Sequence, residues 1–549
     1  MFEDNINLKK IDIRIKFMSF CFFLGFTILF AKLIHITSLS PFNNYQDITT
    51  FKNDKIRPTI VDRNGHIIAS NIEIASVAIR PSLLLNKEDV IDRLLLTIPT
   101  FIREDLENKI LNDKKFVWLK RGITPNEKKR IHDLGIPGLE FINETKRFYS
   151  SGKILSHVLG YVNIDNVGQT GIEKYIEKFQ EQEDRPEENN TINLSIDLEV
   201  SHAMRDELYK AKTKYEASAA AGVLLDVNSG EVISIVSIPD FDPHYPKEAL
   251  KAENINRITN GVYEIGSTFK MFTIAMALDS GIVDLDTLYD ASKPISIGGH
   301  KIRDFYPENR ELTISEIFTH SSNIGTAKIV RDFGVDYHKS FLDKLGMFDK
   351  INTQLPDLPS NLIPQTWREI NSMTISFGMG ISITPLHAAV AGSSLVNGGK
   401  LITPTFIKSH DNEPPDYQQI LELSTSEKMK ELLYKNVMIG SGKKAAVDGY
   451  LVGGKTGTAN KVLNGRYDPD KRLTTFLGAF PIDEPQYILF LLLDEPQGSD
   501  ETYGYATTGW NAAPTFSNIV SRIAPMLEIE PSNSDKYAIE NIIVASNTN

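Results

Sequence analysis

The chain has 549 residues, 41% of them hydrophobic and 24% charged, which is typical of globular protein. This length exceeds one ordinary domain, so we expect two or more. The net charge of -12 argues against nucleic acid or an anionic membrane surface as the main partner, and a single cysteine, Cys21, excludes an internal disulfide.

An apolar segment near the N-terminus is long enough to cross a bilayer. Residues 17–37 contain one formally charged side chain, Lys32, and a helix needs about 20 apolar residues to span the hydrocarbon core. Residues 1–16 carry four basic and three acidic side chains, so we expect this tail in the cytoplasm and the rest of the chain outside. A buried helix or a cleaved signal peptide is the alternative, although Pro41 directly follows the possible cleavage site and disfavours cleavage.

Residues 38–190 are expected to form a separate, mixed domain. They are charged, with short apolar runs, and the string D-R-N-G at residues 62–65 is typical of a turn between two such runs. The acidic residues 181–190, which include Pro186, have the composition of a linker.

Residues 191–527 have the pattern of an α+β domain. Apolar runs at 221–227 and 231–238, joined by a turn, predict a hairpin, and a helical run begins at Ser267. The other predicted elements are strands at residues 450–458, 474–480 and 487–493 and a helix at residues 513–527. Strands at both ends with helices between them suggest one antiparallel sheet, and the polar residues 528–549 are expected to form a frayed tail.

Three short strings in this domain carry candidate reactive side chains. The first, S-x-x-K, places Ser267 and Lys270 one turn apart on the same face of a helix start. A serine becomes a nucleophile when a base removes its proton, and a lysine is such a base when burial or a nearby cation lowers its pKa. Alone, the string more often marks a helix N-cap with an unrelated lysine, and a second match from Ser441 to Lys444 fits that ordinary explanation.

The second string, S-S-N at residues 321–323, follows a predicted helix end at residues 314–318. Alone it is typical of a polar loop. As part of a set, Ser321 is a candidate to relay a proton to a leaving group and Asn323 to hold an amide of a substrate.

The third string, K-T-G-T at residues 455–458, lies on a predicted strand. Its lysine and two threonines suit a terminal carboxylate, and Gly457 would let a ligand backbone approach the strand edge. The N–H groups of Ser267 and Thr458 are candidates for an oxyanion hole. The strings follow one another at intervals of 54 and 134 residues, and three in this order make coincidence improbable.

Together the strings resemble those of the class B penicillin-binding proteins, serine D,D-transpeptidases that cross-link peptidoglycan. The resemblance covers roughly residues 17–525. Outside the three strings it rests on Arg57 with the D-R-N-G turn, residues 147–149, Gly168, and residues 171–173, 378–381, 384–385 and 397–399. Glu264, Lys461 and residues 464–467 resemble the division type more than the elongation type, which is the alternative.

This resemblance implies a penicillin-binding fold, with a five-stranded antiparallel sheet flanked by helices, after an elongated pedestal domain of the dimerisation type. The implied residues are catalytic Ser267, Lys270, Ser321, Asn323 and Lys455 and substrate-binding Thr456, Gly457 and Thr458. No cofactor or metal is implied. The implied partners are stem peptides of peptidoglycan, β-lactams as covalent inhibitors, a lipid-linked glycan-strand polymerase and other division proteins. The implied location is the bacterial inner membrane, with a single span and a periplasmic catalytic domain.

Four other functions are weighed for a chain with these strings. A class A β-lactamase needs a glutamate-held water, yet between Asn323 and Lys455 no glutamate has an asparagine four residues on. A β-lactam sensor or a non-catalytic division scaffold is also possible, but a scaffold would be expected to lose the strings, which are intact. A bifunctional class A synthase would need a glycosyltransferase domain, for which the first 190 residues are short.

Overall fold

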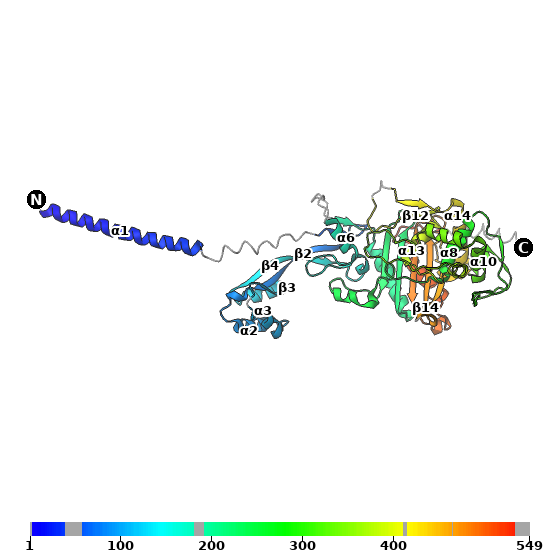
Figure 1. Cartoon of the computed structure of the whole chain (residues 1–549), viewed down its shortest axis with the longest axis horizontal. Helices are drawn as coiled ribbons and strands as arrows, with labels where there is room; N and C mark the ends of the chain where they lie inside the picture. The colour runs from blue at the N-terminus through cyan, green and yellow to red at the C-terminus, as the bar shows by residue number, and fades with distance from the viewer. Residues whose placement is uncertain are drawn as a thin grey trace. The chain divides into compact units, whose positions relative to one another are not determined.

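The computed structural model describes residues 3–38, 57–112, 114–180, 191–409, 414–463 and 465–532. They fall into two units, Met1–Ile56 and Arg57–Asn549 (Figure 1). The expected linker at residues 181–190, most of the expected tail, and Asn464 lie outside the described residues.

The first unit contains one long helix, α1 (Glu3–Ser38). It begins before the predicted span at residue 17, and its segment Asp12–His35 is long and apolar enough to cross a membrane. None of that segment is buried, so apolar side chains such as Phe23 and Phe30 are exposed. Its length and composition fit the expected anchor, and a signal sequence would pass the same test.

A five-stranded mixed sheet organises the first part of the second unit. Its strands are β1 (Thr59–Val61), β2 (Ile67–Ile79), β3 (Val117–Ile123), β4 (Leu139–Tyr149) and β5 (Thr191–Asn193). The turn predicted at residues 62–65 joins β1 to β2, and Gly65 supplies the φ of 86° at its end. The helices α2 (Lys87–Thr97), α3 (Arg103–Ile110) and α4 (Pro125–His132) pack against this sheet through one apolar cluster.

A buried cluster of charges holds helix α6 (Gly171–Gln180) to this sheet. The Glu173 carboxylate accepts a hydrogen bond of 2.8 Å from Nε of Arg57 and one of 2.7 Å from Nε of Arg147. All three side chains are buried, and Arg57 also pairs with Glu177. A buried charge that loses its partner is strongly destabilising. The segment before β1, strand β4 and helix α6, which carry these three side chains, therefore depend on one another.

The turn at residues 62–65 also connects two parts of the second unit. They correspond to the two expected domains: the first domain, built on the mixed sheet, and the second domain, expected from residue 191 on. The Asp62 carboxylate accepts a hydrogen bond from the N–H of Leu198, the first residue of helix α7 (Leu198–Lys214). The Asn64 amide donates to Asp197, the N-cap of that helix, over 3.0 Å. Strand β1 also pairs in parallel with β5, so the two domains share a sheet as well as side-chain contacts.

The second domain is built on the predicted five-stranded antiparallel sheet. Its order is β14-β15-β16-β6-β7, and every neighbouring pair is antiparallel. The strands are β6 (Ala219–Asp226), β7 (Val232–Ile238), β14 (Gly453–Leu463), β15 (Arg466–Phe480) and β16 (Tyr487–Asp494). The pairing of β16 with β6 joins the two ends of the domain, as the sequence suggested.

The other elements of the second unit are helices and short strands. The helices are α5 (Ser156–Leu159), α8 (Lys270–Asp279), α9 (Ile314–Thr319), α10 (Asn323–Phe333), α11 (Val335–Lys344), α12 (Glu369–Ile375), α13 (Pro385–Ser394), α14 (Leu423–Met438) and α15 (Ala512–Ile523). The short strands are β8 (Leu288–Asp290), β9 (Ile295–Ile297), β10 (His300–Ile302), β11 (Glu311–Thr313), β12 (Lys400–Ile402) and β13 (Tyr417–Gln419). The predicted elements are confirmed in type, with shifted ends: β14 begins at Gly453 rather than residue 450, because its pairing with β15 starts there, opposite Ala479.

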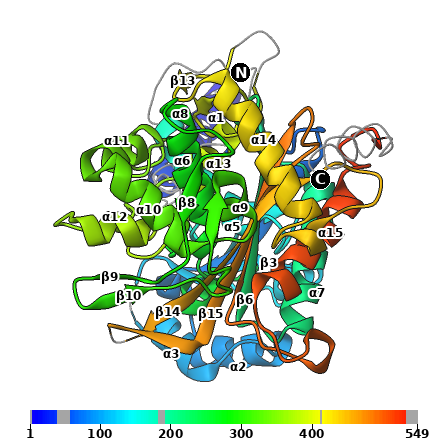
Figure 2. The same cartoon turned by 90° about the vertical axis from the view of Figure 1, so that its right-hand side faces the viewer.

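Both faces of this sheet are buried. Along β6, Ala221, Val223 and Leu225 belong to one apolar core, and Ala220 and Leu224 belong to the other. In Figure 2, α8, α10, α11 and α13 lie over the first face, and α7 and α15 lie on the opposite side. A strand covered on both faces is apolar throughout, which explains the continuous apolar runs in the sequence.

We expect Glu173→Gln to lower the free energy of unfolding by about 3–5 kcal/mol, because two buried guanidinium groups lose their shared carboxylate. Urea titration of the purified protein in detergent would measure this. The control is Asp92→Asn, which removes an exposed ion pair with Arg103 and should cost less than about 1 kcal/mol. Equal losses for the two variants would contradict a structural role for the buried cluster.

Candidate active site

Ser267 lies in a short 3₁₀ turn, Gly266–Phe269, that leads directly into α8. Lys270 is the first residue of that helix and is fully buried, whereas Ser267 is partly exposed. Within the described residues, the Ser267 hydroxyl makes no hydrogen bond. The hydroxyl is therefore open to a ligand, while the amine that follows it one turn later is shielded from water.

Two glycines let this turn sit directly on strand β14. Gly266 has a φ of 56°, and a Cβ there would lie 2.6 Å from the carbonyl oxygen of Thr458. A Cβ on Gly457 would collide with the carbonyl of Ile265 and the hydroxyl of Thr268. The expected approach of a ligand backbone at Gly457 stays a prediction, and on the side where a Cβ would point the space is filled by the protein's own turn.

The hydroxyl of Ser321 lies between two buried lysines. Nζ of Lys270 and Nζ of Lys455 each lie 3.1 Å from Ser321 Oγ, and Nζ of Lys270 also donates to the Ser321 carbonyl. Lys455 Nζ further donates to the carbonyl of Thr456 over 3.2 Å and lies 5.8 Å from the centroid of the Phe318 ring. The folded chain thus brings one residue of each string to a single point.

This arrangement lowers the proton affinity of both amines. Burial, and after it repulsion from Lys455, lowers the pKa of the Lys270 amine well below its usual value, and Asp304 opposes the shift. Burial lowers the pKa of the Lys455 amine to about 7. We assign the proton that the pair retains to Lys455, because Lys270 has the additional repulsion, which leaves Lys270 as a neutral base.

The turn that holds Ser321 is shaped by Asp304, which the sequence strings do not include. Its carboxylate accepts hydrogen bonds from the Ser322 hydroxyl (2.7 Å) and from the N–H groups of Asn323 (2.6 Å) and Ile324 (2.9 Å). Ser322 in turn caps α10. Ser321, just before that cap, has a φ of 60°, a costly backbone conformation for a serine. Asp304 lies outside any recognisable motif, so only the fold reveals it.

Asn323 lies at the start of α10 and is partly exposed. Its amide nitrogen donates to the carbonyl of Arg303 over 2.8 Å. This bond orients the side chain, and the amide oxygen, which accepts no hydrogen bond within the described residues, remains available for an N–H of a substrate.

Two further residues contact the K-T-G-T strand. Thr508 is buried, its hydroxyl donates to the carbonyl of Gly457, and it lies 3.0 Å from the hydroxyl of Thr458. Ser441, from the second S-x-x-K match, lies 2.8 Å from the hydroxyl of Thr456. The sequence offered no reason to choose Thr508, and its pattern set Ser441 aside as an unrelated serine.

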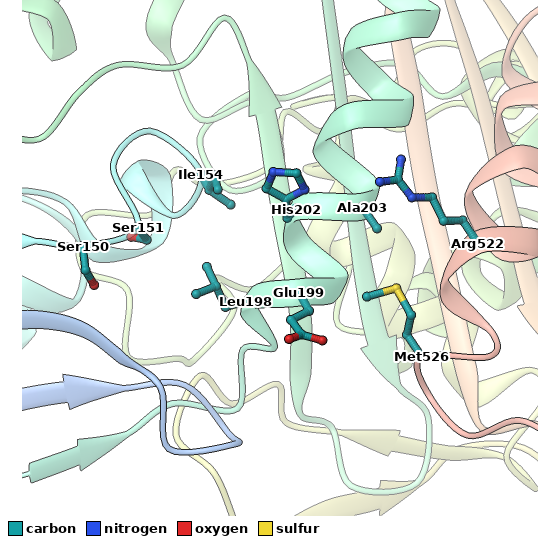
Figure 3. Close-up of a pocket in the computed structure, with 9 residues that line it drawn as sticks. All are labelled: Ser150, Ser151, Ile154, Leu198, Glu199, His202, Ala203, Arg522 and Met526. Carbon is teal, nitrogen blue, oxygen red and sulfur yellow. The ribbon is translucent and has the colours of Figure 1, made fainter.

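A cavity of about 440 Å³ lies elsewhere, where the first domain meets α7 and the end of α15. Figure 3 shows Ser150 and Ser151 on one side of the cavity, Glu199 and His202 on helix α7, and Arg522 on the other side of α7. None of the predicted site residues lines this cavity. Geometry and charge therefore favour the lysine pair, not this cavity, as the reactive centre.

Known proteins match this chain over both domains. The family model for the penicillin-binding protein transpeptidase domain matches residues 220–521, and the one for the penicillin-binding protein dimerisation domain matches residues 53–183. The chain is 32% identical over 483 residues to the probable peptidoglycan D,D-transpeptidase FtsI of Caulobacter vibrioides, covering 86% of this chain and 82% of that protein.

Two other relatives are similar over most of their length. The probable peptidoglycan D,D-transpeptidase PenA of Neisseria meningitidis is 31% identical over 509 residues, covering 87% of this chain and 85% of its own. The peptidoglycan D,D-transpeptidase FtsI of Buchnera aphidicola is 28% identical over 551 residues, covering 92% of each chain. Given these matches and the geometry of the lysine pair, the chain belongs to the class B penicillin-binding proteins, the peptidoglycan D,D-transpeptidases that include the FtsI proteins.

Proposed function

We propose that this protein is a membrane-anchored, division-type peptidoglycan D,D-transpeptidase in which Ser267 forms an acyl-enzyme. The observation that carries the proposal is the buried contact of Lys270 and Lys455 with one hydroxyl, that of Ser321. A serine nucleophile needs a base at neutral pH, and a lysine kept neutral by burial and by a neighbouring cation can supply one.

In the acylation step, Lys270 takes the proton of Ser267, and Oγ attacks the carbonyl of the penultimate D-alanine of a stem peptide. The ester bond forms, the peptide C–N bond breaks, and the departing D-alanine needs a proton on its amine. Ser321, which contacts both lysines, supplies that proton and recovers one from Lys270. In the second step the amine of a neighbouring stem attacks the ester and loses its proton to Lys270; the new amide bond forms, the ester C–O bond breaks, and Lys270 returns the proton to Oγ of Ser267, which restores the neutral base and the free hydroxyl.

The K-T-G-T strand binds the other end of the donor peptide. Its terminal carboxylate is held by Lys455 with the hydroxyls of Thr456 and Thr458, since a cation and two donors match a carboxylate. The N–H groups of Ser267 and Thr458 form the oxyanion hole, for which the contact of Gly266 with the Thr458 carbonyl is the support. Removal of one such donor costs about 3 kcal/mol of transition-state stabilisation.

The proposal extends to the setting of the enzyme. Residues 17–37 anchor the chain in the inner membrane, residues 38–190 form the pedestal, and residues 191–527 form the transpeptidase domain on the periplasmic side. Residues 1–16 stay in the cytoplasm and residues 528–549 form a polar tail. A lipid-linked glycan-strand polymerase and other division proteins are its partners.

Protease added to spheroplasts should degrade the second unit, because the proposed orientation places it outside the inner membrane. Full protection would contradict this orientation.

A fluorescent penicillin should label the wild-type protein on Ser267, because a β-lactam presents its strained carbonyl to the same nucleophile. Mapping of the labelled peptide is the measurement. We expect no label on Ser441 and at least a thousandfold slower labelling of Ser267→Ala. Label on Ser441, or unchanged labelling of Ser267→Ala, would refute the assignment, and rapid steady-state turnover of a chromogenic β-lactam would favour a β-lactamase instead.

The second-order rate constant of acylation should have a bell-shaped dependence on pH. Lys270 must be neutral to act as base, so the rate rises as its lowered pKa is passed. Lys455 must stay charged to bind the carboxylate, so the rate falls above about pH 7. Lys455→Arg should remove the falling limb, since a guanidinium keeps its proton. A rate that climbs steadily to pH 10 would contradict the lowered pKa of Lys270.

A further inference from the structure

The turn that contains Ser441 is built around one buried amide. Asn436, near the end of α14, is fully buried, and its amide nitrogen donates to the carbonyl of Gly454 on β14 over 2.7 Å. The N–H groups of Gly440 and Gly442 both donate to the Asn436 carbonyl, so the chain wraps around this residue. A Cβ on Gly440 would collide with the Asn436 amide oxygen, so this turn of the backbone requires glycine there. Ser441 is thereby held at a defined place beside the strand.

The hydrogen bonds of Ser441 have a defined direction. Because the amide nitrogen of Asn436 faces a carbonyl, its oxygen is the acceptor that faces Ser441, and the Ser441 hydroxyl donates to it over 3.2 Å. A hydroxyl has one proton. The contact of 2.8 Å with Thr456 is therefore made by the Thr456 hydroxyl, which donates to Ser441.

This direction conflicts with the task of Thr456. A carboxylate accepts hydrogen bonds, so Thr456 must turn its proton away from Ser441 to bind one. Its oxygen then needs a donor, and Lys455 Nζ lies at a weak 3.5 Å. Ser441 is the closer candidate, because rotation of its hydroxyl moves its proton from Asn436 to Thr456.

We propose that Ser441 is a positioning residue for the carboxylate of the donor substrate, acting through Thr456. In the free enzyme the chain of donors runs from Thr456 to Ser441 to Asn436. In the complex Ser441 donates to Thr456, and Thr456 donates to the carboxylate. The exchange breaks no covalent bond and transfers no proton between atoms. The inference rests on the proposed function, since it assigns a role within the same site.

The lysine of the second S-x-x-K match has a different task. Nζ of Lys444 lies 3.1 Å from the centroid of the Trp510 ring, and no contact joins it to Ser441 within the described residues. It therefore holds the turn against the loop before α15 by a cation–π contact and does not act as a base for Ser441. This separates a positioning serine from a nucleophile.

The test compares two thioester substrates of the full-length protein, a D-alanyl thioester of thioglycolate and the same thioester with its carboxylate amidated. Ser441→Ala should lower kcat/KM for the carboxylate substrate about fivefold to tenfold, mainly through KM, because one hydrogen bond is lost. For the amidated substrate, kcat/KM should change less than twofold. Ser441→Thr should retain the wild-type values, because it keeps the hydroxyl.

Further variants separate positioning from folding. In a Thr456→Val background, Ser441→Ala should have no additional effect, since the two residues act as one unit. Ser517→Ala is the matched control: it removes a hydroxyl that donates to Ala446 of the same segment, and both substrates should be unaffected. If Ser441→Ala does not fold, Ser441→Cys tests the same loss.

Several results would overturn the inference: equal losses for both substrates, no loss for either, failure of Ser441→Thr to retain activity, or additive effects with Thr456→Val. Ser267→Ala distinguishes this from a failure of the proposed function. If that variant still turned over both substrates, the acyl-enzyme assignment itself would be wrong, whatever Ser441 does.

Discussion

Two lysine amines buried against one hydroxyl are the constraint on which the rest of the catalytic domain depends. A buried charge is expensive, and two like charges in contact are more so, which makes it favourable for one amine to be neutral. Lys270, Ser321 and Lys455 come from a helix start, a turn between helices and an edge strand. The fold must hold these three elements together, because burial lowers the pKa of the Lys270 amine and the nearby Lys455 amine lowers it further.

The means of holding them are close approaches and carboxylates. Glycine at positions 266 and 457 lets the nucleophile's turn lie directly on the strand. Asp304 binds the turn after Ser321 through three hydrogen bonds. In the N-terminal domain the buried charges are paired instead: the guanidinium groups of Arg57 and Arg147 share the carboxylate of Glu173. Charges are compensated where stability is needed and left in conflict where chemistry is needed.

Hydroxyl side chains from elsewhere in the chain contact the threonines of the K-T-G-T strand. Thr508 contacts Thr458, and Ser441 with Asn436 contacts Thr456. Both supporting groups come from loops that lie next to the strand only in the folded chain. The proposed carboxylate site is therefore contacted by residues that the catalytic strings do not contain.

The sequence by itself determined the α+β class, the order of strands and helices, the apolar N-terminal segment and the three strings, because these follow from local periodicity and residue type. It also indicated the family through residues spread over both domains. Only the tertiary structure decided that Ser321 lies between Lys270 and Lys455, that Gly457 makes room for the protein's own turn, and that Asp304, Thr508 and Ser441 support the site. These contacts join residues far apart in the chain, and spacing along a sequence carries no information on which side chains meet when the sheet and its helices pack.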